Sequence, residues 1–156
     1  MEFNIVCVGS LKEKYLKEAQ LEYIKRISGY SKINVIECKE ADYKDLSQEN
    51  IKLAKKKEAD KIKEHLKGYI VALEINGKQF SSEELAKEIK NLEVKGISSL
   101  TLIIGGSYGI FEELSNNANL KLSFGKFTLP HQIMRIVLLE QIYRSLTIIN
   151  NKTYHK

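Results

Sequence analysis

The stretch 124-FGKFTLPHQIMRIVLLEQIYRS-145 does most to decide the fold. It holds the single proline, one of the three histidines and two of the three arginines, all within an apolar run. Pro130 suits the first turn of a helix, where its missing N–H costs nothing, so we expect a helix from Pro130 to about Ile148. At about 100° per residue, its apolar side chains point in nearly every direction. Such a helix must be covered on more than one side, which in a small domain favours a sheet and a second copy, and therefore a homodimer.

The scarce polar groups of this helix fall on two of its faces. His131 and Arg135 share one edge near its start, whereas Glu140 and Arg144 lie i,i+4 on another face, in the order that favours an ion pair. The pair is either structural or part of a site, and His131 taken alone could be an ordinary residue of a helix start. Because lysine supplies 22 of the 25 cationic side chains, an arginine is expected where the planar geometry of its guanidinium is needed for directed contacts.

Outward from this helix, apolar β-rich runs alternate with helical patterns. We expect strands at 3–8, 33–38, 69–74, 99–109 (running into a glycine turn) and 120–125, a turn at 76–78, and helices at 11–28, 48–66 (capped by Ser47), 81–96 and 110–117. Alternation of this kind predicts an α/β fold with a mainly parallel sheet flanked by helices. Residues 1–156 have the length of a single domain.

Composition bounds the function only loosely. No apolar run approaches the roughly 18 residues of a membrane span, and the start has no export signal, so we expect a cytoplasmic protein without membrane contact. Cys7 and Cys38 form no CxxC pair and the three histidines are far apart, so we expect reduced thiols and no metal. The net charge of +5 hints at a polyanionic partner. The lysine-rich segment 52–67 is either a solvated helix face or an RNA-facing patch.

Ligands of open α/β sheets bind at the carboxyl ends of strands, so the turns after Leu73, Ile104 and Phe124 are the candidate sites. The turn IIGGSYG matches neither GxGxxG nor GxxxxGK[ST], which leaves a dinucleotide or nucleoside triphosphate site without support. Its glycines either admit a ligand close to the backbone or are simply required by the turn. The tail 150–156 is either a frayed end or a place where Tyr154 and His155 meet an exposed base.

Four segments together resemble one family: GGSYG at 105–109, SFGKFTLPHQIMR at 123–135, LLEQIYR at 138–144 and YHK at 154–156. They resemble the RlmH (YbeA) family of small SPOUT methyltransferases, and the resemblance covers the whole chain. It implies a homodimeric α/β-knot enzyme, with a C-terminal trefoil knot, that transfers methyl from S-adenosylmethionine to N3 of a pseudouridine in the helix 69 loop of 23S rRNA, on the assembled ribosome. Periodicity alone would indicate an ordinary doubly wound fold without a knot.

The resemblance also implies the site residues. The family's cofactor contacts fall on Leu73, Gly105, Phe124, Gly125, Lys126, Phe127, Thr128 and Leu129. A cradle of backbone and apolar groups suits adenine and a sulfonium, so the Lys126 ammonium is expected to point outward. We expect His155 as a possible base that closes over the target with Tyr154, and Arg135 or Arg144 as contacts to a phosphate or a uracil carbonyl. His131 and Arg135 would organise the pocket.

Two rival functions stay open at this point. One is a SPOUT methyltransferase that acts on tRNA or on another rRNA position. The other is a non-enzymatic ribosome-binding factor with a vestigial cofactor cleft, which binding of S-adenosylmethionine would distinguish from an enzyme.

Overall fold

A five-stranded parallel sheet runs through the middle of the molecule, in the order β2-β1-β4-β3-β5. The computed structural model describes residues 1–43 and 45–154. The strands are β1 (Glu2–Val8), β2 (Lys32–Cys38), β3 (Tyr69–Gln79), β4 (Ser99–Ile104) and β5 (Leu120–Ser123). The helices are α1 (Lys14–Ser28), α2 (Gln48–Lys63), α3 (Ser82–Val94), α4 (Glu112–Asn116) and α5 (His131–Ile149). The predicted α/β fold with a parallel sheet is confirmed.

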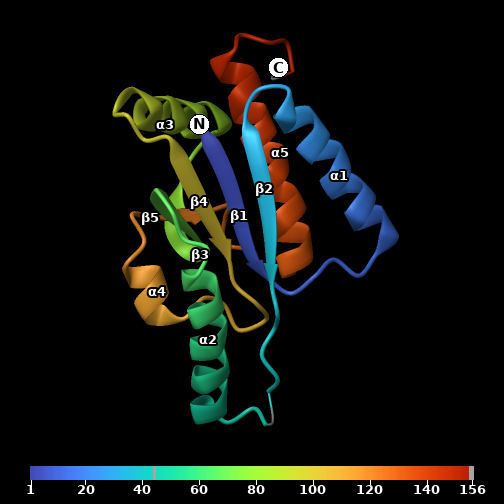
Figure 1. The fold of residues 1–156 in the computed structure, drawn as a ribbon, viewed down its shortest axis with the longest axis vertical. Coiled ribbons are helices and arrows are strands. Elements are labelled where there is room, and N and C mark those ends of the chain that lie inside the picture. Colours follow the sequence, from blue (N-terminus) through green and yellow to red (C-terminus); the bar gives the residue numbers. More distant parts are fainter. Residues whose placement is uncertain (44, 155–156) are drawn as a thin grey trace.

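Helices cover both faces of the sheet, as Figure 1 shows. Alternation along β1 explains the division: Phe3 and Ile5 pack into the core beneath α1, α3 and α5, whereas Val6 and Val8 pack into the core beneath α2 and α4. Because both faces are buried, the strand reads as a continuous apolar run rather than an alternating one. The result is a sheet whose carboxyl edge stays open between two helical layers.

Helix α5 is covered largely by its own chain. It packs on the sheet and against α1 and α3, and none of its 19 residues is exposed. Pro130 stands at the N-cap position, one residue before the helix that it was expected to begin. The apolar pattern of this helix therefore does not by itself require a second copy, and the homodimer stays a prediction.

The expected turn at 76–78 is wrong, because β3 continues through these residues to Gln79. The strand pairs twice with the same residue of β5: Leu73 and, after a bulge, Lys78 both lie opposite Leu122. A Cβ at Gly77 would lie 2.7 Å from backbone carbons of Lys121 and Leu122. The glycine thus permits a close approach of two strands, a non-local requirement that reads like a turn signal in the sequence.

Two local predictions are confirmed and one is wrong. Ser47 caps α2 by accepting a hydrogen bond from the Asn50 N–H. Cys7 and Cys38 are buried free thiols. Tyr15 was expected on the buried stripe of the first helix, but its side chain is 63% exposed because α1 begins at Lys14 and leaves this residue at its free end.

Candidate active site

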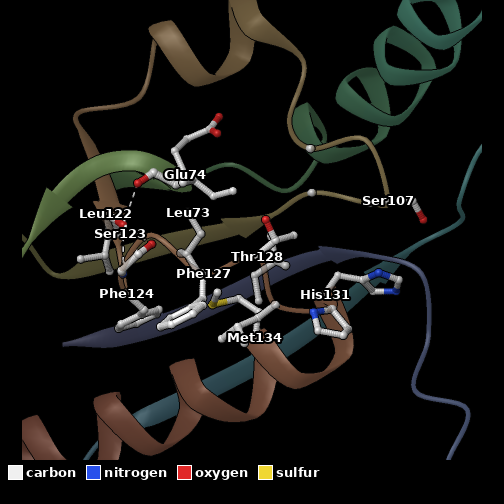
Figure 2. A pocket seen from close by; sticks show the side chains of 18 of the residues that line it. Leu73, Glu74, Ser107, Leu122, Ser123, Phe124, Phe127, Thr128, His131 and Met134 are labelled. Carbon is white, nitrogen blue, oxygen red and sulfur yellow. Dashed lines mark hydrogen bonds between the residues drawn. The ribbon is translucent and has the colours of Figure 1, made fainter.

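A cavity of about 720 Å³ lies at the bulge of β3 and at the carboxyl ends of β4 and β5 (Figure 2). Its volume is within the range of sites for small molecules and cofactors. It is lined by residues 73–75 at the bulge of β3, by the last residue of β4 and the glycine loop after it (104–109), by the end of β5 and the loop after it (122–125 and 127–131), and by Met134 on α5. The segments after Leu73, Ile104 and Phe124, which the sequence indicates as candidate sites, therefore meet at one place, although β3 does not end at Leu73 but bulges there and continues to Gln79.

Glycine is required in the two loops that line this cavity. A Cβ at Gly105 would lie 2.5 Å from the carbonyl carbon of Gly109, which no backbone tolerates without a shift. Gly125 has a φ of +125°, a conformation that side chains rarely adopt. The turn thus needs its glycine for steric reasons and also forms the wall of a cavity, while the close approach of a ligand to this backbone stays a prediction.

Ser123 ties the loop after β5 to the bulge of β3, and sequence reasoning did not single it out. Its buried hydroxyl donates to the Ile75 carbonyl over 2.9 Å and accepts the Gly125 N–H over 3.1 Å. This link fixes one wall of the cavity against another. A serine two residues before a glycine at a strand end was the signal available in the sequence.

Most of the residues to which the resemblance assigns cofactor binding line this cavity. They are Leu73, Gly105, Phe124, Gly125, Phe127, Thr128 and Leu129. Lys126 is exposed and is not among the lining residues. Within residues 1–43 and 45–154, no lysine or arginine lines the cavity, and Glu74 is its one carboxylate. The wall is therefore mostly backbone and apolar side chains, without a fixed positive charge.

An aromatic and sulfur-bearing patch borders the cavity. Figure 2 shows Phe124, Phe127 and Met134 grouped on one side of it. Phe127 is 87% exposed, which leaves a large apolar side chain available to a ligand or a partner.

His131 and Arg135 lie one turn apart at the start of α5, but they have different surroundings. His131 lines the cavity, and its ring rests on the backbone of Gly9, where a Cβ would lie 3.2 Å from Nε2. Arg135 is fully buried below it. Its guanidinium donates to the Gly9 carbonyl over 2.9 Å and to the Gln20 side chain over 3.3 Å, and it forms an ion pair with Glu37.

The two roles expected for Arg135 can now be separated. Its bonds join the ends of β1 and β2 to α1, directly under His131, which fits an organising role. A direct contact with a phosphate or a uracil carbonyl would require the guanidinium to leave these partners, because it has no exposed surface in this structure, and that role stays a prediction. Sequence could place this arginine near the site but could not tell that it faces inward.

A second polar cluster lies toward the other end of α5. Arg144 forms the predicted ion pair with Glu140 over 2.7 Å, and the Tyr154 hydroxyl donates to the same carboxylate over 3.3 Å. The Arg144 guanidinium stacks 4.8 Å above the Tyr154 ring, which also meets Tyr143 edge-on at 4.7 Å. Burial raises the pKa of the Tyr154 hydroxyl, so it is a donor at neutral pH. Tyr154 is therefore packed against the helix and is not part of a frayed end.

The two clusters do not meet within one chain. Neither Arg144 nor Tyr154 lines the cavity, and the 13 residues between His131 and Arg144 correspond to about 20 Å along the helix axis. His155, the expected base, lies outside the described residues.

The described residues form neither a metal-binding cluster nor a membrane-spanning helix. Across 1–43 and 45–154, no group of three or more His, Cys, Asp or Glu side chains is arranged to hold a metal ion. In the same part of the chain, no helix has the length and apolar character needed to cross a membrane.

Comparison with known proteins shows the family of the chain. The sequence model of the family described as "Predicted SPOUT methyltransferase" matches residues 1–155, and the chain belongs to this family. A protein of Clostridium novyi (strain NT) named ribosomal RNA large subunit methyltransferase H is 51% identical over the full length of both chains. A protein of Methanococcus vannielii named putative ribosomal RNA large subunit methyltransferase H is 48% identical, again over both full lengths. These relatives confirm the expected resemblance to the RlmH group.

Solved structures agree at the level of the fold. The tRNA (m1G37) methyltransferase of Aquifex aeolicus superposes with a TM-score of 0.58 at 15% identity, over 100% of this chain and 75% of that one. A probable methylase family protein of Haemophilus influenzae gives a TM-score of 0.56 at 11% identity, over 99% and 70% of the two chains. The SPOUT fold is thereby supported, while the threading of the C-terminal trefoil knot stays a prediction.

Proposed function

We propose that this methyltransferase uses S-adenosylmethionine to methylate N3 of a pseudouridine in the helix 69 loop of 23S rRNA, on the assembled ribosome. The observation that carries the proposal is the cavity at the bulge of β3 and the ends of β4 and β5, with its glycine and apolar walls, in a chain of the SPOUT family. Its relatives are named as methyltransferases of large-subunit ribosomal RNA. Because the ribosome is the proposed substrate, the cytoplasm is the proposed location.

The walls of the cavity fit this methyl donor. Backbone groups of the glycine loop and of the loop after β5 can read the edge of adenine, and Leu73 and Phe124 supply apolar surface for its faces. When bound, the donor supplies an electrophilic methyl group on a positively charged sulfonium. No described lysine or arginine opposes that charge from the lining. Glycine at 105 and 125 leaves room for the ligand to approach the main chain.

The acceptor nitrogen needs help from the protein, because N3–H of an imide is mostly protonated at neutral pH. Transfer of the donor's methyl group to N3 would require the N3 proton to pass to a base. His155 is our candidate for that base, since an imidazole titrates near neutral pH. Holding the acceptor in line with the methyl group would supply most of the rate enhancement.

The separation of the two clusters along α5 supports a homodimer with shared sites. Tyr154 and Arg144 lie about 20 Å along the helix axis from the start of α5, where His131 lines the cavity. One chain therefore cannot apply both groups to one base. A second copy could bring its tail over the cavity of the first, and the half-buried apolar side chains of α5 would provide the contact.

Subunit complementation tests the shared site. We expect His155→Ala and Gly105→Val each to abolish methylation in a pure dimer. After unfolding and refolding together in equal amounts, half of the dimers are mixed and each has one intact site, so roughly a quarter of the wild-type rate should return. A mixture that is no more active than its parts contradicts the shared site. A fully active His155→Ala dimer removes the role of His155.

Contacts to RNA phosphates are assigned to the lysines of α2. Lys52, Lys56 and Lys57 are exposed on this helix, whereas Lys61 pairs with Glu64. A dimer would carry a charge of about +10, twice the +5 of one chain. Binding of ribosomal RNA should weaken steeply as salt rises, and replacing two of these lysines with glutamine should reduce the slope by about two. A salt-independent affinity would argue for a solvated helix face instead.

Mass spectrometry of 23S rRNA fragments from cells with and without the gene tests the reaction itself. Loss of one methyl group from a helix 69 fragment is the expected result. Loss from a tRNA or from another rRNA fragment favours the first rival function. Failure of the wild-type protein to bind S-adenosylmethionine at millimolar concentration in calorimetry favours a non-enzymatic ribosome-binding factor.

A further inference from the structure

A buried carboxylate lies directly behind the glycine loop of the cavity. Glu58 of α2 is 3% exposed and is not one of the lining residues. A Cβ added at Gly106 would lie 3.4 Å from its Oε2 and 3.6 Å from its Oε1. The neighbouring inward residues of α2 are Ala54, Ala59 and Ile62, which fill this core without polar groups. A carboxylate in such a place is costly unless it is hydrogen-bonded, so its partners indicate what it does.

The partners of Glu58 belong to the segment that follows β2. Its Oε1 accepts the Ala41 N–H over 3.0 Å and the Tyr43 hydroxyl over 3.4 Å. Burial raises the pKa of Glu58, while the Ala41 N–H acts in the opposite direction. Burial also raises the pKa of Tyr43 to about 12, so its hydroxyl is a donor at neutral pH. Helix α2 thereby holds a segment that has no regular secondary structure of its own.

The same segment contacts the far end of the glycine loop. The Tyr43 ring lies 4.8 Å from the Tyr108 ring, and Glu40 accepts a hydrogen bond from the Ser107 hydroxyl over 3.1 Å. Ser107 and Tyr108 both line the cavity. Figure 2 shows Ser107 well apart from Leu73 and from the apolar patch. Contacts therefore run without a break from Glu58, through residues 40–43, to the cavity wall.

We propose that Glu58 is a positioning residue of the methyl-donor site, which holds the 107–108 wall in its binding conformation through residues 40–43. This inference rests on the proposed function, because it assumes that the cavity takes S-adenosylmethionine. A carboxylate suits the task better than an apolar side chain, since directed hydrogen bonds specify one arrangement of a loop and packing alone does not. Ala41, Tyr43 and Glu40 then belong to the site although none of them lines it.

Calorimetric titration with S-adenosylmethionine tests the inference. We expect Glu58→Ala to raise the dissociation constant of the donor by about 10-fold, because the substitution removes two hydrogen bonds to a charged acceptor. Glu58→Gln should stay within about 3-fold, because its amide oxygen still accepts the Ala41 N–H. In steady-state assays, Glu58→Ala should raise KM for the donor and leave KM for ribosomal RNA unchanged.

The matched control is Ile62→Ala on the same helix. Ile62 is 2% exposed in the same core but does not touch residues 40–43 through a polar contact. Ile62→Ala should lower the unfolding midpoint without changing the dissociation constant of the donor. All variants are compared at a temperature where each is folded. If Glu58→Ala does not fold, Tyr43→Ala takes its place, and we expect the same 10-fold rise in the dissociation constant of the donor. Tyr43→Phe is its conservative counterpart and should have a smaller effect.

Three results would overturn the inference. They are unchanged donor binding in Glu58→Ala or its substitute, equal weakening in Ile62→Ala, and equal effects of Glu58→Ala on both KM values. A wild-type protein that does not bind the donor would instead refute the proposed function, so the two failures are distinguishable.

Discussion

Replacing Arg135 with methionine should destabilise the protein much more than the same change at Arg26. Each arginine forms an ion pair with a glutamate, Arg135 with Glu37 and Arg26 with Glu22. The Arg135 side chain has no exposed surface, whereas that of Arg26 is 41% exposed. Methionine keeps most of the aliphatic stem, so the comparison isolates the loss of the guanidinium from the loss of packing.

The expected cost follows from what Arg135 leaves behind. Removing one partner of a buried ion pair costs about 3–5 kcal/mol when the other charge stays buried. The Glu37 side chain is 40% exposed and can regain water, which lowers the expected cost. The Gly9 carbonyl also loses its donor. We therefore expect a loss of about 2–3 kcal/mol, or roughly 5–10 °C in the unfolding midpoint for a chain of this size.

Urea denaturation at one fixed protein concentration measures this difference, since the apparent stability of a dimer varies with concentration. Arg26→Met should leave the urea midpoint close to that of the wild type, because exposed pairs contribute little. Equal shifts for the two variants would refute the reasoning that burial of Arg135 sets its contribution. A urea midpoint of Arg135→Met equal to that of the wild type would refute it as well.

Three other predictions concern the backbone, the cavity and the core. Gly77→Ala should lower the free energy of unfolding by about 1–3 kcal/mol in urea denaturation, because its Cβ would press on the backbone of β5 at 2.7 Å. Gly29→Ala, whose Cβ would meet only ordinary contacts, is its control and should stay close to the wild type. Gly105→Ala should weaken donor binding in calorimetry by at least about 10-fold, because its Cβ would displace the backbone at 109. Burial raises the pKa of the Cys7 thiol from 9.0 to about 12, so the thiol ionises only in the unfolded chain between these values. The free energy of unfolding should therefore fall as pH rises from 9 toward 12, and it should fall less steeply in Cys7→Ala than in the wild type. Equal slopes of the free energy of unfolding against pH in the two proteins would contradict this prediction.

Local patterns carried the parts of the fold and site that the sequence could predict. The alternation of apolar runs and helical periods gave the α/β class, and the motifs at 105–109 and 123–135 indicated the family and the strand ends that form the cavity. These features could be read because a helix period, a cap or a motif involves residues that are neighbours in the sequence. The same reasoning failed at 76–78, where glycine serves a contact with a distant strand.

Tertiary structure decided everything that depends on which distant residues come together. Whether an arginine meets solvent or a buried carboxylate, as at Arg135 and Glu37, is fixed only when β2 and α5 lie side by side. The separation of Tyr154 from the cavity, and the contact of Glu58 with residues 41 and 43, arise in the same way. By itself the sequence determined which elements form and which family they belong to. The role of each polar side chain was left to the fold, because burial and partners are properties of non-local packing.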